Sequence, residues 1–89
     1  MKISFTNIKN KVKLAILKNQ ITETMGRIEL NENLLKNAKA DFQKRLDNKE
    51  FGMTTNELGG SIEYYEDQIA TDRPALERMR QEYERLQNK

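Results

Sequence analysis

The residues of this chain whose spacing best suits chemistry are three carboxylates, Glu63, Glu66 and Asp67. Glu63 and Asp67 are four residues apart, so they share one face of a helix, where two carboxylates can act as an acid and a base. The 89 residues include no His and no Cys, which removes the commonest general base, the commonest metal ligand and every thiolate. Helical-bundle metal sites add His at Glu-x-x-His spacing. We therefore interpret these acids as a solvated surface and predict a protein that is not an enzyme and has no cofactor or metal.

Lysines dominate the N-terminal region, where the first 20 residues hold five of them and no acid. Such a segment can contact nucleic-acid phosphates. No Arg precedes Arg27, however, so this segment has no side chain for bidentate base recognition. A basic helix at a membrane surface is less favoured, because the lysines do not gather on one face and Trp is absent. A solvated lysine face is the simpler interpretation, and nucleic-acid binding is the alternative function, with these candidate residues: Lys9, Lys11, Lys13 and Lys18.

An acidic segment lies in the second half of the chain. Residues 57–77 hold six acids and only Arg73 as a base, a net charge of −5, whereas the whole chain carries +2. Tyr64 and Tyr65 are adjacent, so they point to different sides of a helix. Tyr65 fits the apolar stripe, and Tyr64 is expected to be exposed beside the acids, where it can anchor a protein partner. An ordinary tyrosine at the edge of a helix interface is the simpler interpretation of Tyr64.

The elements that carry these residues are indicated by a seven-residue ladder of apolar side chains, a spacing typical of helices that pack along their length. The ladder occurs in two stretches: Leu14, Ile21, Ile28, Leu35 and Phe42, then Ile62, Ile69, Leu76 and Tyr83. The companion positions three residues after the first stretch include polar Thr24, Asn31 and Arg45. We therefore expect the apolar stripe to drift toward Met25 and Leu46, as it does on a straight helix in a bundle.

The predicted boundaries are an N-terminal arm at 1–7, a long helix at 8–47, a turn at 48–53 and a second helix at 54–89. Thr6 or Asn7 is the expected cap of the first helix, although residues 8–19 also fit a strand. Acid–base pairs at a spacing of four support the first helix, namely Glu23–Arg27, Glu32–Lys36 and Asp41–Arg45.

The second helix is expected to open with a capping box formed by Thr54 and Glu57. Gly59-Gly60 interrupts it: either these glycines permit close approach of Phe42 or Leu46, or the regular helix starts later, with Ser61 as its cap. Pro74 removes one backbone hydrogen bond. Because the ladder keeps its phase through Pro74, we expect a kinked but continuous helix or two collinear helices.

Folding the two helices back about the turn places the ladders side by side. The predicted layers are Phe42 with Ile62, Leu35 with Ile69, Ile28 with Leu76, and Ile21 with Tyr83. Residues 1–14 have no counterpart, because the chain stops at Lys89. The first helix should therefore overhang, and apolar side chains left over by folding usually mark a binding surface.

These patterns predict an all-α, coiled-coil-like antiparallel helical hairpin that assembles into a small helical bundle. The predicted function is a protein–protein interaction module, such as an adaptor, inhibitor, chaperone or assembly subunit. It would bind itself, as a dimer or small oligomer, or a larger protein, and the basic arm of one chain would meet the acidic 57–77 segment of another. The interface residues that we predict are Ile8, Val12, Leu14, Leu17 and Tyr64.

The expected location is the cytoplasm. The longest apolar run, residues 14–17, is far shorter than the roughly 20 residues of a membrane span. Lys18 closes that run, and no small-residue cleavage site follows it, so a signal peptide is a poor fit.

Overall fold

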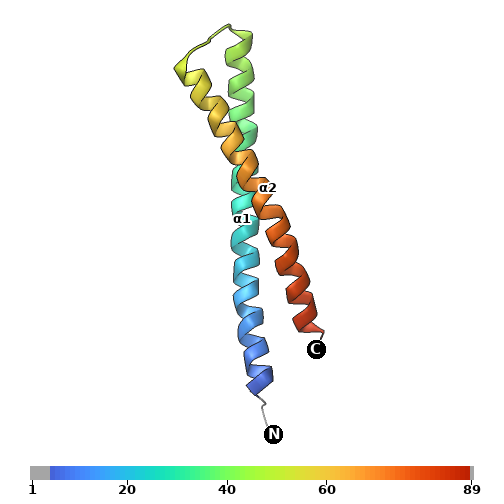
Figure 1. The fold of residues 1–89 in the computed structure, drawn as a ribbon. Helices are drawn as coiled ribbons and strands as arrows, with labels where there is room; N and C mark the ends of the chain where they lie inside the picture. Colours follow the sequence, from blue (N-terminus) through green and yellow to red (C-terminus); the bar gives the residue numbers. More distant parts are fainter. Residues whose placement is uncertain (1–4, 89) are drawn as a thin grey trace.

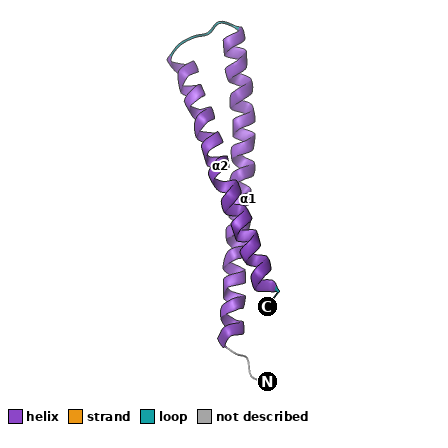
Figure 2. Ribbon diagram, turned by 45° about the vertical axis from the view of Figure 1, so that its right-hand side comes forward, coloured by secondary structure: helices purple, strands orange, loops and turns teal. Residues whose placement is uncertain are grey.

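The computed structural model describes residues 5–88, with side chains from residue 8 onward, as two long helices joined by a short turn. Helix α1 spans Phe5–Asp47 and helix α2 spans Met53–Gln87. They run antiparallel and cross near the middle of the molecule (Figures 1 and 2). The rod measures 72 × 15 × 14 Å. The predicted all-α helical hairpin is therefore confirmed.

The inner face of α1 forms a seam in which shielded side chains alternate at spacings of three and four residues. Thr24 is only 1% exposed, whereas Met25 is 46% exposed. The expected drift of the stripe is therefore wrong at Met25, whereas Leu46 is half-buried. Two helices that wrap around each other keep a seven-residue seam whatever the chemistry of its members. The seam of α1 consists of Leu14, Leu17, Ile21, Thr24, Ile28, Asn31, Leu35, Ala38, Phe42 and Arg45.

Helix α2 presents a matching seam, and the predicted register is confirmed for three of its four layers. Leu35 and Ile69 line one open groove between the helices. Phe42 with Ile62, and Ile21 with Tyr83, each line another. The seam of α2 consists of Thr55, Leu58, Ile62, Tyr65, Ile69, Asp72, Leu76, Met79, Tyr83 and Leu86.

The start of α1 differs from the sequence prediction. The helix already includes Phe5, Thr6 and Asn7, so neither Thr6 nor Asn7 precedes it as a cap. The predicted arm at 1–7 is wrong for residues 5–7, and residues 1–4 lie outside the described part of the chain. The alternative of a strand at 8–19 is also wrong, because this whole segment is helical.

The turn ends α1 with backbone hydrogen bonds and starts α2 without a side-chain cap. The amides of Lys49 and Glu50 donate to the carbonyls of Leu46 and Arg45, at 3.0 and 2.8 Å. Lys49 adopts a φ of 58°, the left-handed conformation that favours glycine. Helix α2 begins at Met53 after Gly52, with no side-chain hydrogen bond at its cap, so the predicted capping box of Thr54 and Glu57 is wrong.

A hydrogen bond from the side chain of Thr55, next to Thr54, connects α2 to this turn. The hydroxyl of Thr55 donates to the carbonyl of Glu50 at 2.8 Å. Thr55 is buried in the seam, and this bond holds the start of α2 against the turn.

Helix α2 continues through both of its expected interruptions. A methyl group added at Gly59 would lie 3.6 Å from a ring carbon of Phe42, which confirms the predicted approach of this aromatic side chain. A later helix start at Ser61 is wrong, because its hydroxyl donates to the carbonyl of Glu57 inside the helix. Pro74 lies within the helix, as the continuous phase of the ladder predicts.

Candidate protein-interaction surface

Helix α1 runs past the end of α2, as the register predicts (Figure 1). The last shared groove brings Leu17 of α1 to Leu86 of α2. That groove is also lined by Lys13 and Ile16, and α2 ends at Gln87, so residues 5–12 of α1 have no helix beside them within residues 5–88. We call residues 5–12 the free end of α1.

The structure divides the predicted apolar interface residues into two groups. Ile8 and Val12 are 47% and 53% exposed at the free end. Leu14 and Leu17 are half-buried and belong to the seam, so they are not part of an exposed docking face. Ile16, at 52% exposed, was missed because it lies outside the seven-residue ladder. Its spacing of four from Val12 was the available signal, since such residues lie on one helix face.

The same face of α1 carries a second apolar group beyond the free end. Leu30 and Leu34 are 58% and 37% exposed, and Gly26 lies one turn before them. At 3.6 residues per turn, the 18 residues that separate the two groups make about five full turns. Sequence reasoning missed this second group. We name the outer face of α1 by its residues: Ile8, Val12, Ile16, Gly26, Leu30 and Leu34.

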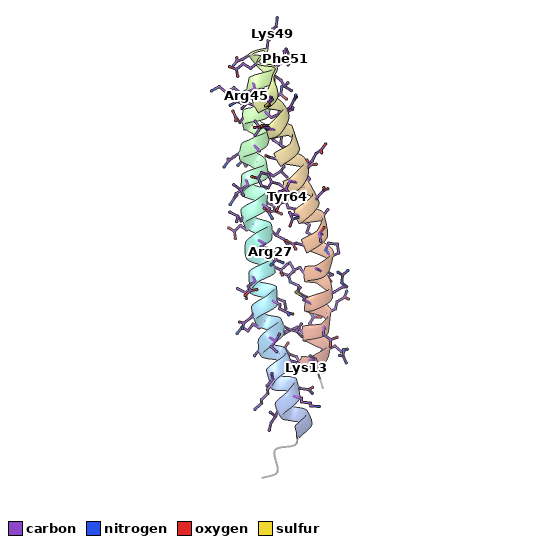
Figure 3. All side chains as sticks on the ribbon, turned by 60° about the vertical axis from the view of Figure 1, so that its left-hand side comes forward. Lys13, Arg27, Arg45, Lys49, Phe51 and Tyr64 are labelled. Atoms are coloured by element: carbon purple, nitrogen blue, oxygen red, sulfur yellow. The ribbon has the colours of Figure 1, made fainter. Side chains whose placement is uncertain are left out.

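The four predicted nucleic-acid-binding lysines are exposed, and none forms an ion pair with another side chain described here. Lys9, Lys11 and Lys13 are two residues apart, so each points about 200° around the helix from the last. Lys13 lies near the end of α2 (Figure 3), and it lines the groove between Leu17 and Leu86. The lysines therefore point to different sides of α1 and do not form a single patch.

A bidentate ion pair joins the two helices at the centre of the rod. Nε and Nη2 of Arg27 each donate to one oxygen of Asp72 at 3.3 Å. Asp72 is buried in the seam, whereas about half of the Arg27 side chain remains exposed. The hydrogen bond and the charge of Asp72 raise the pKa of Arg27 above its usual value.

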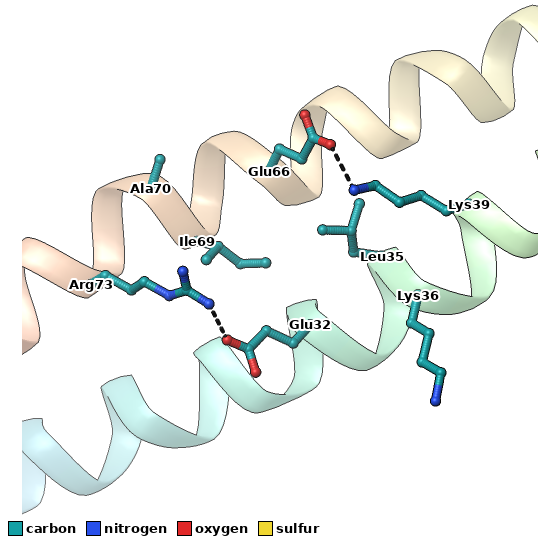
Figure 4. Close-up of a pocket in the computed structure, with 8 residues that line it drawn as sticks. All are labelled: Glu32, Leu35, Lys36, Lys39, Glu66, Ile69, Ala70 and Arg73. Atoms are coloured by element: carbon teal, nitrogen blue, oxygen red, sulfur yellow. Dashed lines mark hydrogen bonds and ion pairs between the residues drawn. The ribbon is translucent and has the colours of Figure 1, made fainter.

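Two further ion pairs flank the groove between Leu35 and Ile69. Lys39 lies 3.3 Å from Glu66, and Arg73 donates to Glu32 (Figure 4). Lys39 thus pairs with Glu66, as Arg27 does with Asp72, so two acids of the acidic segment are already paired within the hairpin. The segment is therefore less available to a partner than its net charge predicts.

The cross-helix pairs also change the predicted pairs within α1. Asp41 and Arg45 form the expected contact at 3.4 Å. The other two expected pairs, Glu23–Arg27 and Glu32–Lys36, are replaced, because Arg27 turns to Asp72 and Glu32 turns to Arg73. Glu23 consequently has no ion-pair partner among the described side chains.

Tyr64 is exposed, as predicted, at 59%. Its ring meets that of Tyr65 edge to face, with centroids 5.8 Å apart. The adjacent Glu63 and Asp67 are exposed and form no ion pair within the described residues. Tyr64 lies far along the rod from Lys13, so it does not belong to the surface at the free end (Figure 3).

Other surface features bear on function less directly. Among the described residues, no group of three or more acidic side chains could hold a metal ion. No described helix is long and apolar enough to cross a membrane. Phe51 and Met53 are strongly exposed at the turn, at the opposite end of the rod from Lys13.

Comparisons of the chain with protein-family models, with curated proteins and with solved structures find no match. The functional assignment therefore depends on the geometry of the hairpin and its exposed surfaces.

Proposed function

We propose that this protein is a protein–protein interaction module that binds through the outer face of α1, starting at its free end. The observation that carries this proposal is the exposure of Ile8 and Val12 beyond the end of α2, continued by Ile16 at the edge of the last shared groove. Burying apolar surface contributes about 25 cal/mol per Å². Three large apolar side chains on consecutive turns thus favour a partner over water.

The mode of binding follows from the spacing. Apolar side chains at i, i+4 and i+8 are the anchors with which a helix lies against a partner helix or in a groove. The lysines beside this stripe would steer and orient an acidic partner more than they would add affinity. An adaptor, an inhibitor, a chaperone and an assembly subunit all need such a surface.

Site-specific photo-crosslinking tests this proposal. A photoreactive amino acid replaces Val12 in the protein expressed in its native cells, and a matched control replaces Thr71, an exposed residue of α2. We expect a discrete cross-linked product from position 12 and none from position 71. A product at twice the chain mass identifies self-association, and another mass identifies a larger protein. Equal products from both positions, or none from position 12, would contradict the proposal.

Nucleic-acid binding is a second candidate, favoured by the lysines that have no ion-pair partner in the described structure. Replacing Lys9, Lys11 and Lys13 with Gln should abolish nucleic-acid binding if this function is right, and should largely spare binding through an apolar face. Salt separates the two functions as well, because phosphate contacts weaken steeply with ionic strength. A gel-shift titration at two salt concentrations measures how the substitutions and the salt each change nucleic-acid binding.

A further inference from the structure

We infer that the partner of the outer face of α1 is a second copy of this chain, bound antiparallel, α1 against α1. This inference rests on the proposed function and specifies its partner. A two-fold axis near residue 21 would place Ile8 opposite Leu34 of the second copy, Val12 opposite Leu30, and Ile16 opposite Gly26.

The geometric reason is that the outer face is self-complementary. Its two groups have the same internal spacing of four residues and lie on the same side of α1, about five turns apart. A two-fold interface uses one surface twice, so each group must fit the other on the opposite copy. The resulting strip, from Ile8 to Leu34, is about 39 Å long at 1.5 Å per residue, and polar Asn19 and Glu23 lie between its two apolar groups.

Gly26 contributes a second observation. The space in front of it is open, with no atom within 4 Å of an added Cβ, so packing within the hairpin does not require a glycine. A glycine inside a helix is less favourable than an alanine at the same position. In the antiparallel pair, Ile16 of the second copy would lie over Gly26, where the missing side chain leaves room for it.

Charge selects the antiparallel direction. A parallel pair would bring the lysines of residues 8–18 against the same lysines of the other copy. An antiparallel pair brings them toward Glu29, which is exposed and has no ion-pair partner among residues 8–88. Lys11 and Glu29 are also 18 residues apart, so they flank the apolar strip on the same side. On the other flank Lys13 approaches Arg27, whose charge is already bound to Asp72.

The acidic face of α2 is a weaker fit for the same free end. Its exposed apolar side chains, Met53 and Tyr64, are 11 residues apart and do not match the spacing of Ile8, Val12 and Ile16. Docking of the free end on this face is therefore the competing outcome of the test.

Cysteine cross-linking tests the register directly, since the native chain has no cysteine. Two single variants, Val12→Cys and Leu30→Cys, are mixed and mildly oxidised. We expect the mixed V12C–L30C dimer to form in large excess over either homodimer, because the same residue on two copies lies about 27 Å apart along the strip. A statistical mixture would overturn the inference. So would faster coupling of V12C to Tyr64→Cys, which would indicate docking on α2.

Light scattering over a concentration series tests the energetics. We expect the wild-type chain to dimerise, and Leu30→Gln with Leu34→Gln to raise the dissociation constant at least about tenfold, since each change occurs twice. Met25→Gln is the matched control, because Met25 is equally exposed but lies off the outer face. Circular dichroism should show unchanged helicity in all variants. A monomeric wild type, or an unchanged dimer in the leucine variant, would refute the pairing.

A charge reversal adds an independent readout. Glu29→Lys should weaken the dimer, and Lys11→Glu in the same chain should restore it. Failure of this rescue would refute the proposed flank contact.

The pairing and the proposed function can fail separately. If position 12 still cross-links to another protein while V12C and L30C do not couple, the interaction function stands and the second copy is excluded as its partner. If position 12 cross-links to nothing, the proposed function fails as well.

Discussion

Thr24 is the most buried side chain of the described hairpin, yet it is polar, and its replacement by valine gives a sharp prediction. Its hydroxyl donates to the sulfur of Met79 at 3.8 Å and accepts from Arg27 at 3.5 Å. Both distances are at the long limit for hydrogen bonds, so both contributions are small. Valine keeps the shape and buries one more methyl group, worth about 0.8 kcal/mol. We expect Thr24→Val to raise the free energy of unfolding by about 0.5 kcal/mol.

Thermal unfolding followed by circular dichroism measures this effect. For a domain of this size, 0.5 kcal/mol corresponds to a rise in Tm of about 2–4 °C. Thr24→Ala is the matched control and should lower stability by about 1 kcal/mol, because it removes a buried methyl group. A fall in Tm for Thr24→Val would refute the reasoning, since it would mean that the hydroxyl, and not the methyl group, stabilises the seam.

Three further predictions concern the backbone and the central ion pair. Gly59→Ala should stabilise the protein by about 0.5–1 kcal/mol, because the added methyl group meets only an ordinary contact with Phe42. The control Gly60→Ala, whose methyl group meets open space, should stabilise it equally. Urea unfolding measures both effects, and a loss of stability at position 59 alone would show that the Phe42 ring cannot adjust. Lys49→Gly should raise stability by about 0.5–1 kcal/mol by relieving the left-handed backbone, and a lower urea midpoint would contradict this. The raised pKa of Arg27 means that, as pH rises from neutral, its ion pair with Asp72 continues to stabilise the fold up to the usual arginine pKa and is lost only as pH rises through the still higher folded value. The difference in Tm between wild type and Asp72→Asn should therefore stay constant from about pH 7 to 10, and a difference that shrinks across this range would show that the partner of Asp72 is not Arg27.

The periodicity of large apolar residues was enough to predict the hairpin and its register. Leu35 meets Ile69, and Phe42 meets Ile62, because equal ladders on antiparallel helices can align in few ways. Continuity through Pro74 followed from the same phase. The overhang of α1 followed from the same register, which leaves its first residues without a counterpart among residues 53–87.

The polar members of the seam could not be predicted by this route. Hydrophobicity identifies Leu and Ile as buried but says nothing of Thr24 or Asp72, whose burial depends on partners contributed by both helices. Ion pairs are ambiguous for the same reason: Arg27 had an acid in its own helix, and the structure shows it bound to the other helix.

The exposed surface was predicted only in part. Ile8 and Val12 were identified because the predicted register gives them no counterpart on the second helix, whereas Leu14 and Leu17 proved to be seam residues. Ile16, Leu30 and Leu34 were missed because a search for a core ignores apolar residues outside its ladder. The spacing of four residues from Val12 to Ile16 and from Leu30 to Leu34 was visible in the sequence, but only the structure shows that these side chains are exposed.

The rod shape described above has a consequence for hydrodynamics. The radius of gyration is 20.1 Å, whereas a compact chain of this length would have about 12 Å. The monomer therefore experiences high friction for its mass. An antiparallel pair centred near residue 21 would be only about 78 Å long, taking 1.5 Å per residue, while its mass doubles. Association would thus make the particle relatively thicker, and the frictional ratio from sedimentation velocity should fall as the sedimentation coefficient rises.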